Sequence, residues 1–175
     1  MSETTYDWTR FRRQVFIAAP AETVFHAWLT ADQITRWFIA AATYTAPNGT
    51  VRQPDEPVQA GDQYHWRWHQ DYEETGRILQ VGPGLMLQFT FGATYDASDS
   101  PIVVTVRCHE EDGLTRLELA QANMADRPDV HYGWHMGCNL GWSFFLTNLK
   151  ALLEHGVDLR ETDPERAYLS RALTT

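Results

Sequence analysis

The feature that most constrains this chain is the contrast between alternating segments in its middle and one helical segment near its end. Residues 63–69 (QYHWRWH) place Tyr64, Trp66 and Trp68 on one side and polar side chains on the other. A period of two is typical of a β-strand with one covered face. Further strand-like segments lie at residues 14–18, 76–81, 85–91, 102–109 and 114–121.

From about residue 133 to residue 155 the apolar positions are spaced by three and four, which indicates one long helix. Its stripe includes Cys138, Trp142, Phe145, Leu149 and Leu152. A sheet with one apolar face has to be covered, and this helix is the only element long enough to do so. We therefore expect it to lie across an antiparallel sheet, with Trp142, Phe145 and Leu149 buried.

Local signals predict the remaining helices. Pro20 suits the first turn of a short helix over residues 21–29, and Thr30 with Gln33 forms a capping box for a second short helix. Gly156 is in the position where glycine commonly ends a helix. Asp163 and Pro164 predict the start of another short helix that reaches about residue 173.

Composition and charge argue against several kinds of function. The chain has 175 residues, a net charge of −9 and a sequence pI of about 5.1, so its average field repels nucleic acid and anionic membranes. No apolar run approaches the ~20 residues needed to cross a bilayer, and the first ten residues do not resemble a signal peptide. We expect a cytoplasmic protein in which Cys108 and Cys138 are free thiols.

Several motifs, in order, resemble one known family. These are residues 17–38 (IAAPAETVFHAWLTADQITRWF), the strand at 63–69, the Gly-Pro-Gly turn before LMLQFTF, and the terminal GWSFFLTNLKALLEHG. The chain is similar to the activator of heat-shock-protein ATPase homologue family, within the START-like or SRPBCC superfamily. The resemblance implies an α+β helix-grip fold, like that of the birch pollen allergen. In it a curved antiparallel sheet wraps around a long C-terminal helix, and two short helices follow the first strand.

The resemblance covers nearly the whole chain and suggests its organisation. We expect a helix-grip domain at residues 11–157, an N-terminal extension at 1–10 and a C-terminal extension with a short helix at 158–175. The loops at residues 45–60 and 123–133 look individual to this chain, and we expect them to rim a cavity mouth.

An unusual number of large rings, including seven Trp, predicts an apolar cavity between the sheet and the long helix. Rings that cannot interdigitate leave room for a guest, so we expect binding of a small hydrophobic ligand, a lipid or an aromatic metabolite. The expected lining is Trp37, Tyr64, Trp66, Trp68, Leu87, Phe89, His135, Asn139 and Trp142.

Two other classes of function stay open. A cyclase, dehydratase or hydrolase would need polar groups at depth, for which the inward-capable candidates are Gln88, Gln121, His135 and Asn139. A chaperone or stress-response accessory would act through an exposed apolar patch instead. The chain could also form a homodimer.

No motif indicates a cofactor or catalytic residues. His131, His135 and Cys138 have spacings that could place them on one helix face, but no second ligand pair supports zinc, so we expect no metal. The acidic residues Asp71, Glu73 and Glu74 are expected at an exposed hairpin tip, where paired carboxylates would not meet a substrate.

Overall fold

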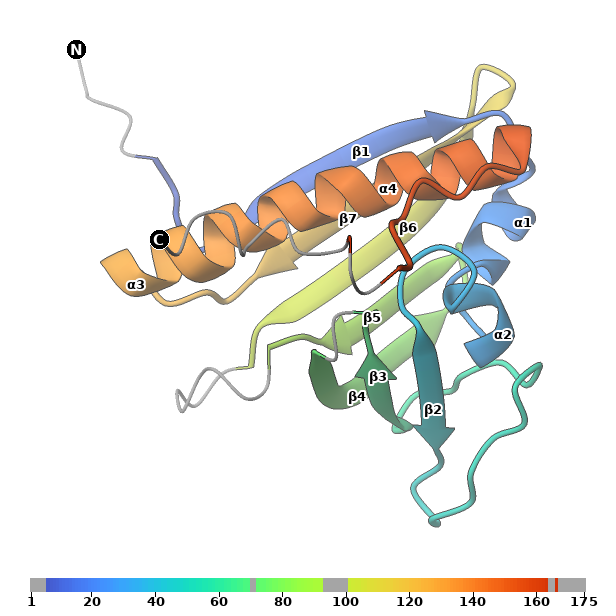
Figure 1. Ribbon diagram of the computed structural model, residues 1–175, viewed down its shortest axis with the longest axis horizontal. Coiled ribbons are helices and arrows are strands. Elements are labelled where there is room, and N and C mark those ends of the chain that lie inside the picture. The colour runs from blue at the N-terminus through green and yellow to red at the C-terminus, as the bar shows by residue number, and fades with distance from the viewer. Residues whose placement is uncertain (1–5, 70–71, 93–100, 164–165, 167–175) are drawn as a thin grey trace.

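Seven strands form the sheet in the order β1-β7-β6-β5-β4-β3-β2, and every neighbouring pair is antiparallel (Figure 1). The computed structural model describes residues 6–69, 72–92, 101–163 and 166. The strands are β1 (Phe11–Ile17), β2 (Ala41–Thr45), β3 (Gln63–Arg67), β4 (Glu73–Gly82), β5 (Met86–Thr90), β6 (Val103–Glu111) and β7 (Leu114–Ala122).

The long helix lies across one face of this sheet, as predicted (Figure 1). It comprises α3 (Pro128–Val130), a π-helical turn η1 (His131–Met136) and α4 (Gly137–His155) in direct succession. Gly156 ends α4 with φ of 70°, a left-handed conformation that glycine adopts without a steric penalty. The predicted helix-grip fold is confirmed.

Two short helices follow β1, as the motifs predicted. These are α1 (Ala21–His26) and α2 (Ala31–Ile34). Thr30 caps α2, because its hydroxyl accepts a hydrogen bond from the backbone N–H of Gln33 at 3.1 Å. The helix predicted after Asp163 lies almost entirely outside the described residues.

The pattern of apolar residues failed to predict two features of the sheet. β2 is an edge strand in which only Tyr44 is buried, so it lacks the alternation that identifies a half-buried strand. β4 begins three residues before the predicted start, and Gly76 lies inside it. A Cβ at Gly76 would overlap the ring of Tyr64 on the neighbouring strand, so only glycine leaves room for that ring.

Aromatic rings fill the space between the helices and the sheet. Trp28 and Trp37 meet edge to face with ring centroids 4.5 Å apart, and Tyr64 stacks on Trp66 at 4.0 Å. Trp142 is 3% exposed, and its indole N–H donates to Gln121 Oε1 at 2.8 Å. Trp142 and Leu149 are buried as expected, whereas Phe145 is half-buried.

Residues of both predicted extensions contact the domain. Near the N-terminus, the backbone carbonyl of Trp8 accepts a hydrogen bond from His135 Nδ1 at 2.9 Å. After α4, the fully buried Asn148 donates to the carbonyl of Trp37 at 2.7 Å and accepts from the N–H of Leu159 at 2.7 Å. These bonds tie both segments to the domain core.

Candidate ligand pocket

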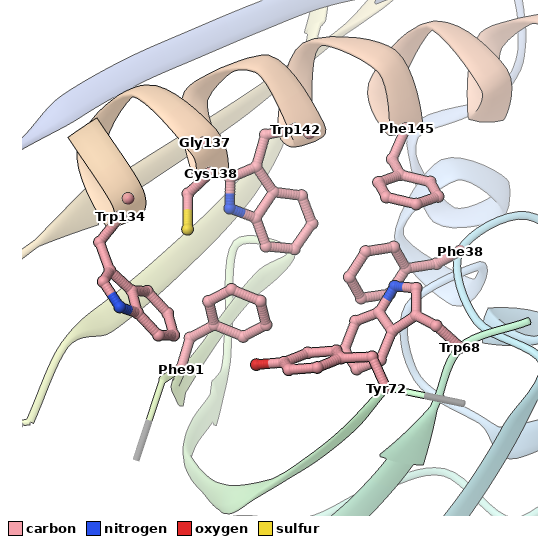
Figure 2. A pocket seen from close by; sticks show the side chains of 11 residues that line it. Phe38, Trp68, Tyr72, Phe91, Trp134, Gly137, Cys138, Trp142 and Phe145 are labelled. Atoms are coloured by element: carbon pink, nitrogen blue, oxygen red, sulfur yellow. The ribbon is translucent and has the colours of Figure 1, made fainter. Parts of the chain in front are cut away.

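A pocket of about 280 Å³ opens between the N-terminal half of the long helix and the end of the β3–β4 hairpin (Figure 2). Its walls are almost entirely aromatic. It is lined by Phe38, Trp68, Tyr72, Phe91, Gly133, Trp134, Gly137, Cys138, Gly141, Trp142 and Phe145.

Different elements contribute the rings. Phe38, which follows α2, stacks on Trp142 of α4 at a centroid distance of 4.9 Å and meets Phe145 edge to face at 4.8 Å. Trp68 lies just after β3 and contacts Phe38 at 5.3 Å. Phe91, just after β5, lies 5.4 Å from Trp142 on the other side. The rings therefore support one another around the pocket, which keeps its walls in place.

Three glycines on the helix supply the open space. Gly133, Gly137 and Gly141 are spaced by four, so they share one face of the helix, and all three line the pocket. A Cβ at Gly137 or Gly141 would have no heavy atom within 4 Å. Packing therefore does not require glycine there. The space that the missing side chains leave is part of the pocket, and it is open to solvent at Gly137, which is exposed, whereas Gly141 is half-buried.

Gly92 serves the pocket in a different way. Its φ is 77°, and a Cβ there would overlap the ring of Trp134. The absence of a side chain lets Trp134 of η1 lie against the end of β5. Trp134 then forms one wall of the pocket beside Phe91, with ring centroids 6.3 Å apart.

A buried carboxylate lies behind the aromatic wall. The Tyr72 hydroxyl donates to Glu74 Oε2 at 2.7 Å, and Glu74 Oε1 accepts from the backbone N–H of Gly92 at 3.0 Å. Glu74 is only 1% exposed, so the expectation that it lies at an exposed hairpin tip was wrong. The alternation of β4 places Glu74 and Ile78 on the inner face of the sheet.

The two polar side chains of the lining stay neutral at physiological pH. Burial raises the pKa of Tyr72, and its hydrogen bond to Glu74 and the charge of Glu74 raise it further. Burial also raises the pKa of the Cys138 thiol to about 11, with a contribution from the Glu74 charge. Cys138, whose sulfur lies on the pocket side of the helix in Figure 2, is therefore a thiol and not a thiolate nucleophile.

The structure brings only part of the predicted lining together. Trp68 and Trp142 line the pocket. The other five apolar residues pack in the core with exposures of 2% or less: Trp37, Tyr64, Trp66, Leu87 and Phe89. Tyr64 stacks on Trp66, Trp66 meets Phe89 edge to face, and the Tyr64 hydroxyl donates to the carbonyl of Thr90 at 2.6 Å. Whether these five residues contact a ligand stays a prediction.

His135 and Asn139 lie on other faces of the long helix. The ring of His135 is covered by Tyr6, whose hydroxyl donates to Nε2 at 2.8 Å, and by Trp8. Asn139 borders a separate surface hollow between α4, β1 and β7. Whether either residue contacts a ligand stays a prediction.

The three residues considered for zinc have different polar partners, although the rings of His131 and His135 both pack against Trp8. His131 is 2.7 Å from Asp126, His135 donates to the backbone of Trp8, and Cys138 faces the pocket. Within the described part of the chain, no group of three or more His, Cys, Asp or Glu side chains is arranged to hold a metal ion.

Several pocket residues were missing from the sequence-based set, above all Tyr72, Phe91, Trp134 and the three glycines. The spacing Gly133-x₃-Gly137-x₃-Gly141 was the signal available, because glycine at every fourth position of a helix is costly without a reason. Of the two loops expected at the mouth, only 123–133 contributes, through Gly133. The loop after β2 packs elsewhere, for example through the hydrogen bond from Val58 N–H to the carbonyl of Leu29 at 2.8 Å.

The fold and the motifs agree with a known family. Residues 18–154 match the family model described as Activator of Hsp90 ATPase homolog 1-like protein. The chain belongs to this family. The resemblance noted from the motifs is thereby confirmed, and the Activator of Hsp90 ATPase homolog 1-like region contains the whole described pocket. No curated protein matches the sequence significantly.

Solved structures with the same fold include three that bear on this Activator of Hsp90 ATPase homolog 1-like chain. The protein SSP2350 from Staphylococcus saprophyticus is 22% identical, with a TM-score of 0.65 over 86% of this chain and 96% of that one. The Aha1 dimer from Colwellia psychrerythraea is 16% identical, with a TM-score of 0.67 over 84% and 97%. DynU16, from the dynemicin biosynthetic locus, is 16% identical, with a TM-score of 0.66 over 88% of this chain and 50% of that one.

Proposed function

We propose that the protein binds a small apolar molecule, about the size of one or two rings, in the pocket beside α4. The observation that carries this proposal is an aromatic cavity whose volume depends on Gly137 and Gly141, where a Cβ would meet nothing. Its 280 Å³ lies just below the range of about 300 to 1,000 Å³ for small-molecule sites. That size favours a compact aromatic metabolite over a long-chain lipid.

Binding is favoured over catalysis by the chemistry of the lining. The polar side chains that reach the pocket are Tyr72 and Cys138, and both stay neutral. A hydrolase or cyclase needs a base or nucleophile able to react near neutral pH. A neutral thiol and a neutral phenol instead suit the orientation of a bound guest.

The test is a titration of an environment-sensitive apolar dye, followed by the fluorescence of the dye and of Trp. We expect saturable binding to the wild type and its loss in Gly141→Leu, because the added side chain projects into the pocket. Thr147→Leu adds a similar side chain to the exposed face of the same helix and should leave binding intact. Absence of saturable binding to the wild type, or equal binding to Gly141→Leu, would refute the proposal.

A second proposal concerns self-association. Met136, Leu140 and Phe144 form an exposed apolar stripe on the outer face of the long helix, with exposures of 43%, 71% and 43%. The dimeric state in the name of the Colwellia relative supports a homodimer, and we propose this stripe as its contact surface. Sedimentation at high micromolar concentration should show a dimer that Leu140→Glu dissociates and that Val51→Glu, at an exposed apolar residue of the loop after β2, does not. A monomeric wild type would contradict it.

We also propose a cytoplasmic location. Cys108 and Cys138 are free thiols, which suits a reducing compartment. None of the described helices is long and apolar enough to pass through a bilayer. Tagging the protein and following it by cell fractionation would test the proposed location.

A further inference from the structure

We propose that Tyr72 and Glu74 make the pocket selective for apolar ligands that carry a hydrogen-bond donor, such as phenols, alcohols or aromatic amines, over carboxylic acids. This inference rests on the proposed function, since it concerns the polar group of the same guest. It follows from the direction of one hydrogen bond at the pocket wall.

The hydroxyl proton of Tyr72 is used in a hydrogen bond to Glu74. The two oxygens lie 2.7 Å apart, and a carboxylate can only accept, so the phenol donates. Glu74 is held in place by the Gly92 N–H on its other oxygen at 3.0 Å and is 1% exposed. The Tyr72 oxygen therefore presents only lone pairs to its remaining neighbours.

That oxygen belongs to the pocket. Tyr72 is one of the lining residues, and Figure 2 shows its hydroxyl at the end of the ring that points toward Phe91. A guest with an O–H or N–H group can donate to this oxygen. A guest with only acceptors gains nothing there and loses its hydrogen bonds to water.

A carboxylate guest meets a further cost. It would sit close to the Glu74 carboxylate, and like charges repel, although less strongly than in a closed cavity because Tyr72 is 47% exposed. The ring faces around the pocket are themselves electron-rich, which favours cations and the positive edges of donors over anions. The indole N–H of Trp142 offers no compensation, because it already donates to Gln121.

Calorimetric titration at neutral pH with three probes of one shape tests this selectivity. The probes are naphthol, methoxynaphthalene and naphthoate, each substituted at the same ring position. Naphthol can donate, methoxynaphthalene can only accept, and naphthoate is an anion. For the wild type we expect naphthol to bind about 3- to 10-fold tighter than methoxynaphthalene, the worth of one hydrogen bond, and naphthoate to bind most weakly.

Two variants separate the roles of the pair. Tyr72→Phe should bring naphthol and methoxynaphthalene to equal affinity, whereas Tyr132→Phe, which removes a hydroxyl from a residue that is 72% exposed, should change nothing. In Glu74→Gln an amide N–H can donate to Tyr72, which frees the phenol proton for the guest. We expect that variant to shift preference toward methoxynaphthalene and naphthoate, with its fold checked by thermal melting.

The outcomes distinguish the two proposals. If all three probes bind the wild type with equal affinity and Gly141→Leu abolishes binding, the pocket binds apolar guests but the selectivity is refuted. An unchanged preference in Tyr72→Phe refutes it as well. If none of the probes binds, both the selectivity and the proposed function fail.

Discussion

Replacing single glycines on α4 by alanine measures how much free energy of unfolding the protein loses by having glycine beside the pocket. Glycine inside a helix is less favourable than alanine by about 0.8–1 kcal/mol, because it loses more backbone freedom on folding. At Gly137 and Gly141 the backbone is helical and an added Cβ would meet no atom within 4 Å. We therefore expect Gly137→Ala and Gly141→Ala each to stabilise the protein by about 1 kcal/mol.

Gly156 provides a matched control at the end of the same helix. It too has no neighbour within 4 Å of a built Cβ, but its φ is 70°. A residue with a side chain is strained in that left-handed region by about 1–2 kcal/mol. Gly156→Ala should therefore destabilise the protein, although the free space around it is the same as at Gly137 and Gly141.

Thermal and urea unfolding, followed by circular dichroism, would measure all three variants. For a chain of this length 1 kcal/mol corresponds to about 2–4 °C in melting temperature. If Gly137→Ala and Gly141→Ala melt at or below the wild-type temperature, the space beside the helix is already filled, and the reasoning that places a pocket there is wrong. If Gly156→Ala is stabilising, backbone conformation does not govern these effects.

Three other outcomes follow from the structure. Trp142→Ala should cost about 3–5 kcal/mol in urea unfolding, whereas Val157→Ala, at an exposed residue after α4, should cost less than about 0.5 kcal/mol. A small loss at Trp142 would contradict its burial. Burial raises the pKa of Cys108 from about 9 to about 12, so the stability from its neutral thiol is complete below about pH 9 and is lost as the pH rises toward 12. The urea midpoint should fall over that range, and less steeply in Cys108→Ala. With its pKa near 11, Cys138 should react with iodoacetamide at pH 8 about 100-fold more slowly in the folded than in the unfolded protein, by mass spectrometry; equal rates would contradict its surroundings.

Periodicity predicted the fold because it reports which face of an element is covered. The spacing of Trp142 and Leu149 identified the buried face of α4, and the alternation around Trp66 identified the inner face of β3. The strand Ala41–Thr45 was not predicted, because an edge strand with small side chains shows no such alternation. The burial of Glu74 was not predicted, because a charged side chain suggests exposure. The alternation of β4 places this side chain on the inner face of the sheet, beside Tyr72.

The location of the pocket was harder to predict. The alternation of a strand shows which side chains face the helix, but it does not show which of them border a cavity. Tyr64, Trp66 and Trp68 share one side of a strand, yet the first two are enclosed by neighbouring rings and only Trp68 reaches the pocket. What decides between them is which rings the neighbouring elements place against each side chain. The glycines at 137 and 141 were the sequence signal for open space beside the helix, and the pattern of apolar residues does not contain that signal.

The order of strands in the sheet has a consequence for how the chain assembles. From β2 to β7 each strand pairs with its neighbour along the chain, so hairpins can form one after another. β1 is different, because Phe11 pairs with Gln121 across most of the domain. Closing so long a loop costs entropy that no local contact offsets, so we expect the first strand synthesised to be the last to dock. Pulsed hydrogen exchange during refolding should then protect the amides of β6 before those of β1.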